Sequence, residues 1–209
     1  MKKLILMILA LIPVMVMAKG DDSKYLTGAV PEENGQVVFR KTFTVKGKTD
    51  AEILKVLMAW TQNLVDESIP APGQYARVMG TDERSTTVRV CQWLVFKNKP
   101  LYLDRARMRY QLNAQVDGGR VTLSLSQIRY YYGEHEDLDR NADIRAEEWI
   151  TDAEALNKQG TKLYPKSGKF RRKTVDYVQQ LFAGAMDSFE QDSEPVKASA
   201  PVRRNVVEG

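Results

Sequence analysis

Residues 105–132 read RARMRYQLNAQVDGGRVTLSLSQIRYYY, and this stretch decides the fold. Apolar and polar side chains alternate on both sides of a DGGR turn at 117–120, which is typical of two antiparallel strands joined by a tight hairpin. With the two glycines as the loop, Val116 lies opposite Val121, and the same register places Ala114 opposite Leu123 and Leu112 opposite Leu125. The predicted hairpin therefore has one apolar face and one polar face.

The apolar phase slips near the end of the second strand, because apolar residues resume at Ile128, Tyr130 and Tyr132. One extra residue near Ser126-Gln127 would place Ile128 opposite Tyr110 and restore the apolar face. The sequence therefore predicts a β-bulge at this point.

The segments before the hairpin supply more strands and a helix. Apolar residues alternate between positions 37 and 45, which predicts a strand, and Thr49 with Glu52 forms a capping box that opens a helix. This helix ends before Pro70, and its apolar stripe is Ile53, Leu57, Trp60 and Leu64. Two further strands are expected at about 74–80 and 86–97.

The segments after the hairpin predict two helices. A short amphipathic helix from Arg145 is expected to bury Trp149, Ile150, Ala153 and Leu156. A long helix follows, somewhere between Lys169 and Glu190. The whole pattern predicts an α+β domain: an antiparallel sheet whose apolar face is covered by the first and last helices, with the other face open.

Residues 1–18 are predicted to be a secretory signal peptide, because Lys2 and Lys3 precede an apolar run from Leu4 to Met17. The run is too short for a stop-transfer helix of about 20 residues. Cleavage is expected after Ala18, so the protein is expected in the periplasm or outside the cell. The predicted organisation is then a flexible leader at 19–35, one domain at 36–189 and a disordered tail at 190–209.

Composition argues against several partners and anchors. The chain has 31 Lys plus Arg against 27 Asp plus Glu, and loss of Lys2 and Lys3 leaves 29 basic residues, so net charge implies no nucleic-acid partner. Cys91 is the only cysteine, which excludes an internal disulfide. No cysteine follows the apolar run, so we expect no lipid anchor, and no membrane span after removal of the signal peptide.

The open face of the sheet is the predicted binding surface. Arginine forks there suit a carboxylate or phosphate, and aromatic rings offer a stacking surface for a planar ligand. A solvent-facing Trp93 favours an occupant, whereas the alternative is an ordinary charged face that keeps the sheet soluble. The candidate residues are Arg89, Trp93, Arg105, Arg107, Arg109, Arg129 and Tyr131.

Residues 137–148 match the spacing of an EF-hand calcium loop, with candidate ligands Asp137, Asp139, Asn141, Asp143 and Glu148. Two features disagree with this pattern: Ala142 stands where the sharp turn normally needs glycine, and the preceding segment is predicted to be a strand rather than a helix. The alternative interpretation is an acidic surface loop.

The basic run from Lys169 to Lys173 lies at the start of the last helix, where the helix dipole disfavours cations. Either the helix starts later, or these residues meet an anion or an acidic partner; an exposed basic turn is the simplest interpretation. Catalytic signals are few, since His135 and Cys91 are the only histidine and thiol and the chain contains no hydrolase or nucleotide-binding motif.

Several segments resemble an uncharacterised domain of exported Bacteroidetes proteins with a TBP-like fold. They are 93–96 (WLVF), 103–112, 128–130 (IRY), 146–152 (AEEWITD), 155–158 (ALNK) and 166–174 (KSGKFRRKT). The resemblance runs from about residue 36 to about 185, and it implies a curved antiparallel sheet with helices on one face. It carries no active-site residues to transfer, and the TBP name concerns shape only, with no implication of DNA binding.

The sequence thus favours a non-enzymatic exported cell-envelope protein that uses the open sheet face to bind an anionic or aromatic ligand or an envelope protein. The alternative is a hydrolase with carboxylates contributed by separate loops. No cofactor is implied apart from the calcium considered above.

Overall fold

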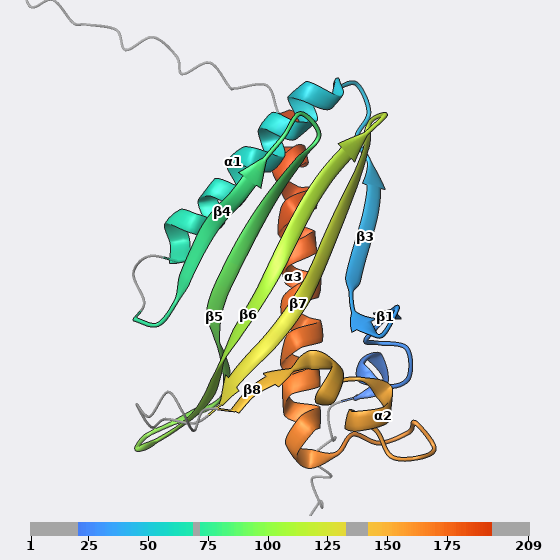
Figure 1. Cartoon of the computed structure of the whole chain (residues 1–209), viewed down its shortest axis with the longest axis vertical. Coiled ribbons are helices and arrows are strands. Elements are labelled where there is room, and N and C mark those ends of the chain that lie inside the picture. The colour runs from blue at the N-terminus through green and yellow to red at the C-terminus, as the bar shows by residue number, and fades with distance from the viewer. Residues whose placement is uncertain (1–20, 69–71, 133–141, 194–209) are drawn as a thin grey trace, which may run out of the picture.

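The structure is a computed structural model that describes residues 21–68, 72–132 and 142–193. A six-stranded antiparallel sheet runs in the order β3-β7-β6-β5-β4, and β8 pairs with β7 (Figure 1). The strands are β3 (Phe39–Thr44), β4 (Tyr75–Thr81), β5 (Ser85–Lys99), β6 (Tyr102–Asp117), β7 (Arg120–Tyr132) and β8 (Ala142–Arg145). A small separate pair consists of β1 (Glu32–Glu33) and β2 (Gln36–Val37).

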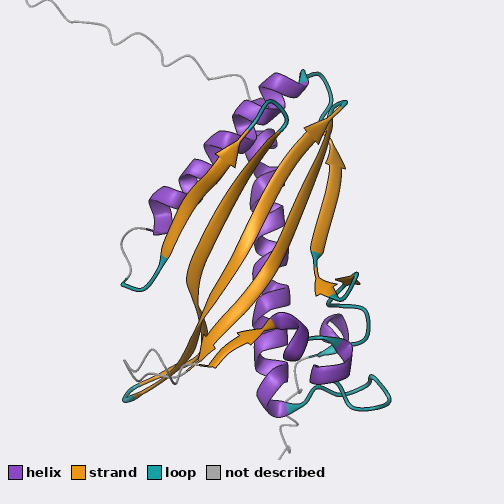
Figure 2. Cartoon of the chain, in the orientation of Figure 1, coloured by secondary structure: helices purple, strands orange, loops and turns teal. Residues whose placement is uncertain are grey.

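Two long helices, α1 (Asp50–Ser68) and α3 (Pro165–Ser193), cover the same face of the sheet. Both lie behind the curved strands in Figure 2, where the opposite face of the sheet points toward the viewer. This arrangement confirms the predicted α+β class with an open antiparallel sheet and helices on one face. No helix among the described residues is long and apolar enough to cross a membrane.

The central hairpin has the predicted register. Val116 pairs with Val121, and Leu112 pairs with Leu125. The predicted bulge is also present: Arg109 pairs with Arg129 and Gln111 with Ser126, so Gln127 and Ile128 together lie opposite Tyr110. Gln127 takes the left-handed conformation, with φ of +54°.

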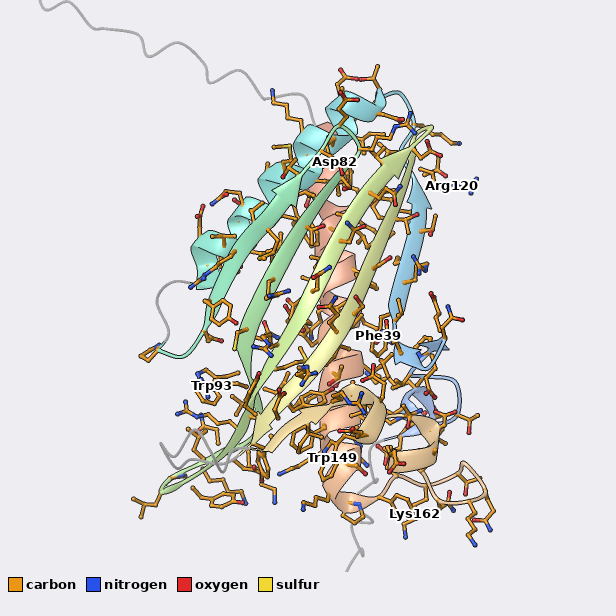
Figure 3. All side chains as sticks on the ribbon, viewed as in Figure 1. Phe39, Asp82, Trp93, Arg120, Trp149 and Lys162 are labelled. Atoms are coloured by element: carbon orange, nitrogen blue, oxygen red, sulfur yellow. The ribbon has the colours of Figure 1, made fainter. Side chains whose placement is uncertain are left out.

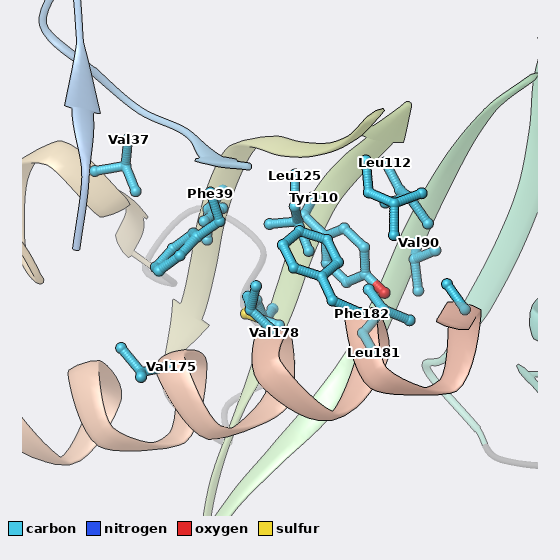
Figure 4. Close-up of a cluster of buried hydrophobic side chains, with 14 of the residues drawn as sticks. Val37, Phe39, Val90, Tyr110, Leu112, Leu125, Val175, Val178, Leu181 and Phe182 are labelled. Atoms are coloured by element: carbon cyan, nitrogen blue, oxygen red, sulfur yellow. The ribbon is translucent and has the colours of Figure 1, made fainter. Parts of the chain in front are cut away.

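The core lies between this sheet and α3 (Figure 4). Each large apolar side chain moved out of water there stabilises the fold by roughly 1.5–3 kcal/mol. The members drawn in the figure include Val175, Val178, Leu181 and Phe182 of α3, against Val90, Tyr110, Leu112 and Leu125 of the sheet.

The capping box at the start of α1 is confirmed. The backbone N–H of Glu52 donates to the Thr49 hydroxyl at 3.3 Å, and the Thr49 N–H donates to the Glu52 carboxylate at 2.8 Å. These two bonds satisfy donors that the first turn of a helix leaves free.

The predicted flexible leader packs on the domain wherever the structure describes it. Tyr25, the last residue of the 3-10 helix η1 (Ser23–Tyr25), and Val30 are both buried. The fully buried guanidinium of Arg171 donates to the carbonyl oxygens of Tyr25 at 2.5 Å and Leu26 at 2.6 Å. Residues 25–30 therefore pack on the domain.

The basic run at the start of α3 has acidic partners within the chain. The helix begins at Pro165, earlier than predicted, because proline suits the first helical position. Lys169 pairs with Asp104 at 2.8 Å, and Arg172 pairs with Asp22 at 2.5 Å. The interpretation as an exposed basic turn is therefore wrong.

The predicted amphipathic helix after Arg145 is instead two short pieces, the 3-10 helix η2 (Ala146–Glu148) and α2 (Asp152–Ala155). Thr151 is extended between them, with ψ of 168°, because it is the N-cap of the second piece. Ile150 and Leu156 are buried as predicted, but Ala153 is exposed.

The predicted signal peptide at 1–18 lies outside the described residues. The predicted disordered tail at 190–209 begins inside α3, because this helix continues to Ser193. Residues 194–209 lie outside the described residues.

Candidate functional site

The structure places all seven candidate ligand-binding residues on the sheet face opposite α1 and α3. Cross-strand pairing sets Trp93 beside Arg107 and Arg107 beside Tyr131. Two residues further along β6, Arg109 pairs with Arg129. We call this set the arginine face: Arg89 and Trp93 of β5, Arg105, Arg107 and Arg109 of β6, and Arg129 and Tyr131 of β7. That these residues bind a ligand stays a prediction.

Trp93 lies on the open face as predicted, but its side chain is half-buried. The Arg105 guanidinium lies 3.9 Å from the centre of a Trp93 ring, and the indole N–H donates to the carbonyl oxygen of Pro72 at 3.0 Å. Gly73 closes over the indole so tightly that a Cβ there would lie 3.2 Å from it. Trp93 therefore packs against Arg105 and the Pro72-Gly73 backbone, and part of its side chain stays exposed.

Tyr131 has a similar place between the other arginines. The guanidinium carbons of Arg107 and Arg109 lie 5.5 and 5.2 Å from the centre of its ring. Such contacts are each worth about 0.5–1 kcal/mol at exposed sites. The two aromatic residues thus order the long arginine side chains without neutralising their charge.

Some arginines of the described chain pair with a carboxylate, and others do not. Elsewhere in the described chain a carboxylate lies within ion-pair distance of Arg40, Arg84, Arg145, Arg171 and Arg172. On the arginine face only Arg129 has such a partner, Asp143 at 2.6 Å. Within residues 21–68, 72–132 and 142–193, no carboxylate pairs with Arg89, Arg105, Arg107 or Arg109; the same holds for Arg77 on the neighbouring edge strand and for Arg120 at the hairpin turn.

A small hollow of about 150 Å³ lies within the arginine face. It is lined by Arg89, Arg109 and Arg129, together with Tyr110 and the bulge residue Gln127. Three positive side chains from three adjacent strands therefore share one concave site, and an anion is the ligand such a site can hold.

Sequence patterns missed two residues of this region. The EF-hand spacing predicts Asp143 only as a calcium ligand, although the alternation in Ala142-Asp143-Ile144-Arg145 is that of a strand. In the structure Asp143 pairs with Arg129. Arg77 pairs across strands with Arg89, and its alternation with Tyr75 in the predicted strand is the signal that could have placed it on this face.

The calcium loop cannot be followed through the structure. Asp137, Asp139 and Asn141 lie outside the described residues. Asp143 and Glu148 are described, and each pairs with an arginine, Arg129 and Arg145 respectively. Calcium binding stays a prediction, which a rise in melting temperature on adding calcium would support and an unchanged temperature would remove.

The described part of the chain contains neither a cluster of metal ligands nor an activated thiol. There, no group of three or more His, Cys, Asp or Glu side chains lies close enough together to hold a metal ion. Cys91 is buried, and burial raises the pKa of its thiol, against the activation that a nucleophilic cysteine needs. His135 lies outside the described residues.

The hydrolase alternative requires two carboxylates in one cavity. Three further hollows, of about 320, 620 and 450 Å³, contain Glu67, Asp152 and Glu147 respectively, one carboxylate each. Asp152 accepts a hydrogen bond from Arg171, and Glu147 accepts one from the Val37 N–H at 2.7 Å. These described hollows therefore offer no acid and base pair.

Comparisons with known proteins identify the fold and the family. The model of a domain of unknown function (DUF4468) with TBP-like fold matches residues 39–131. The crystal structure of a DUF4468 family protein from Bacteroides ovatus is 36% identical, with a TM-score of 0.74, covering 85% of this chain and 100% of that one. A TBP-like protein from Parabacteroides distasonis is 20% identical, with a TM-score of 0.62 over 77% of this chain and 97% of that one, and shows the fold alone.

No curated protein matches the chain. The identity to the Bacteroides ovatus structure extends over that whole chain and confirms the resemblance noted in the sequence. This protein therefore belongs to the DUF4468 family, whose domain has a TBP-like fold and no known function.

Proposed function

We propose that this protein is an exported cell-envelope protein that binds an anionic partner on the arginine face. One observation carries the proposal: among the described residues, Arg89, Arg105, Arg107 and Arg109 lie together without a carboxylate. Like charges held side by side repel one another, and a bound anion would remove that cost.

Export is supported by the basic start and short apolar run of residues 1–18. Mass spectrometry of the protein from a fractionated native cell tests it. We expect a mature chain that begins at Lys19 in the periplasmic or external fraction, whereas an intact Met1 terminus in the cytoplasm would contradict export.

Anion binding is best tested with a defined polymer. Labelled poly-L-glutamate supplies many carboxylates, and its binding to the purified domain can be followed by fluorescence anisotropy over a range of salt concentrations. We expect binding that weakens as salt rises, because exposed charges are screened over about 10 Å at 0.1 M salt.

A pair of double variants locates the binding surface. Arg105→Gln with Arg107→Gln should weaken polymer binding about tenfold, since partly exposed ion pairs contribute up to about 1 kcal/mol each. The matched control is Arg84→Gln with Arg120→Gln, which removes the same charge at the other end of the sheet, where Figure 3 shows Arg120 far from Trp93. Equal weakening in the two double variants would mean that only net charge matters, and would contradict the proposal.

A further inference from the structure

The hollow between Arg89, Arg109 and Arg129 is the most specific feature of the arginine face. We propose that it binds a phosphate monoester group. This inference rests on the proposed anion-binding function and names the chemistry of one subsite within it.

The three arginines come from three adjacent strands and can reach a common point. Arg109 and Arg129 are direct cross-strand partners. Arg89 is two residues from Cys91, the other partner of Arg109, so it lies on the diagonal, about 7–8 Å away between backbones. The hollow of about 150 Å³ exceeds the roughly 30 Å³ of a water molecule, so it has room for a polyatomic group.

The β-bulge is what brings the third arginine to this face. Gln111 pairs with Ser126, so a ladder that continued in this register without a bulge would place Ile128 opposite Arg109, and Arg129 opposite Met108 on the helix-covered face. Bulges commonly re-aim side chains next to binding sites. At the bulge Gln127 takes a φ of +54°, a backbone conformation that non-glycine residues rarely adopt.

The charge of the site matches a dianion. Three guanidinium groups line the hollow, and Asp143 neutralises one of them through its 2.6 Å contact with Arg129. The remaining two positive charges match a phosphate monoester, which carries about −1.5 to −2 at pH 7, better than a single carboxylate. The fork of Arg also fits the oxygens of phosphate in a bidentate manner.

Phosphate gives this site a pH dependence that comes from the ligand. Among the described residues, the neighbouring ionisable groups are Tyr75 and Arg77 of β4, Cys91 of β5, Arg107 of β6, Tyr131 of β7, Asp143 and Arg145 of β8, and Glu147 and Glu148 of η2. Carboxyl, phenol, thiol and guanidinium groups ordinarily ionise outside pH 5–8, and burial raises the pKa of Cys91 and Tyr131 further from it. A phosphate monoester, in contrast, gains a proton near pH 6.

Glycerol phosphate is the probe, titrated into the protein and followed by calorimetry or by phosphorus NMR. We expect its affinity to fall up to about tenfold between pH 8 and pH 5, because little of the dianion remains at pH 5. Sulfate, which stays a dianion over this range, should bind with an affinity that does not change with pH. A parallel loss of sulfate affinity would show that a protein group titrates, and would overturn the charge-matching argument.

Three variants place the ligand in the hollow. Arg89→Gln and Arg109→Gln should each weaken glycerol phosphate binding about tenfold or more, since each removes charge-assisted hydrogen bonds. Asp143→Asn should strengthen binding several-fold, because it removes the carboxylate that competes for Arg129. Arg84→Gln is the control with the same charge change and should have no effect.

A second experiment distinguishes a phosphate group on a membrane from one in solution. Phosphatidylcholine vesicles that contain phosphatidic acid present the same monoester on a membrane, whereas glycerol phosphate presents it in solution. Binding to either that depends on Arg89 and Arg109 supports the inference, and binding to neither overturns it. If poly-L-glutamate still binds through Arg105 and Arg107 in that case, the subsite fails while the proposed function stands.

Discussion

Arginines on the two sides of this sheet differ in their burial and in their hydrogen-bond partners. On the helix side, Arg171 is fully buried and donates to three carbonyl oxygens and to Asp152. On the open side, the Arg107 guanidinium lies near the rings of Trp93 and Tyr131, and no carboxylate of the described chain pairs with it. The first arrangement uses charge to hold distant segments together, whereas the second keeps charge available.

The largest effect should come from breaking the buried side. Arg171→Met leaves three carbonyl oxygens without their donor and Asp152 without its cation, so we expect the free energy of unfolding to fall by about 3–5 kcal/mol. Urea denaturation measures this loss. A loss below about 1 kcal/mol would show that the buried network is not what ties residues 21–30 to the domain.

A smaller loss is expected at the pair between Lys169 and Asp104. The Asp104 side chain is 8% exposed and accepts two hydrogen bonds from Lys169, at 2.8 and 3.0 Å. Lys169→Met removes this partner, and we expect a loss of about 2 kcal/mol, because the Lys169 side chain is itself 24% exposed and partly solvated. The double variant with Asp104→Asn should recover part of that loss in a denaturation cycle; no recovery would mean that the two residues are not coupled.

The same pair predicts a dependence of stability on pH. Burial alone would raise the pKa of Asp104, but hydrogen bonds from Lys169 and Tyr132 outweigh it and lower the pKa below its ordinary value. A lowered pKa in the folded state gives stability that is complete above about pH 4 and is lost as pH falls through the folded pKa. Unfolding curves from pH 5 to pH 2 should therefore decline less in Asp104→Asn than in the unmodified protein, and equal declines would refute this assignment.

The smallest effect on stability is expected on the arginine face. Arg109→Gln removes one of several like charges and no ion pair, but it also removes the contact with the Tyr131 ring, and these two effects oppose each other. The free energy of unfolding should therefore change by no more than about 0.5 kcal/mol in either direction. Thermal and urea unfolding of this variant beside Arg171→Met would sharpen the contrast between the two sides. A loss of 2 kcal/mol or more would make Arg109 a structural residue.

Local patterns were enough to predict the sheet and its two faces. The register from Val116 to Leu125, the bulge at Gln127 and the cap at Thr49 all depend on neighbouring residues or on one tight hairpin. Because alternate residues of a strand face opposite sides, the same periodicity assigned the seven residues of the arginine face to one surface.

Long-range contacts could not be predicted in the same way. Tyr25 and Arg171 are 146 positions apart, and no local pattern indicates that a polar leader is clamped by a buried arginine. The half-burial of Trp93 likewise depends on the Pro72-Gly73 turn reaching over the next strand. The pairing of Arg129 with Asp143 was hidden because the acidic spacing around Asp143 favoured a calcium loop over a strand.

The central claim is that the arginine face binds anions in the native state and does little for the fold itself. Thermal unfolding with and without poly-L-glutamate, at constant ionic strength, tests this claim directly in the unmodified protein and in Arg105→Gln with Arg107→Gln. A ligand that binds only the native state raises the melting temperature, so we predict a rise in the unmodified protein that is largely absent in the double variant. The same rise in both proteins, or none in either, would contradict the account.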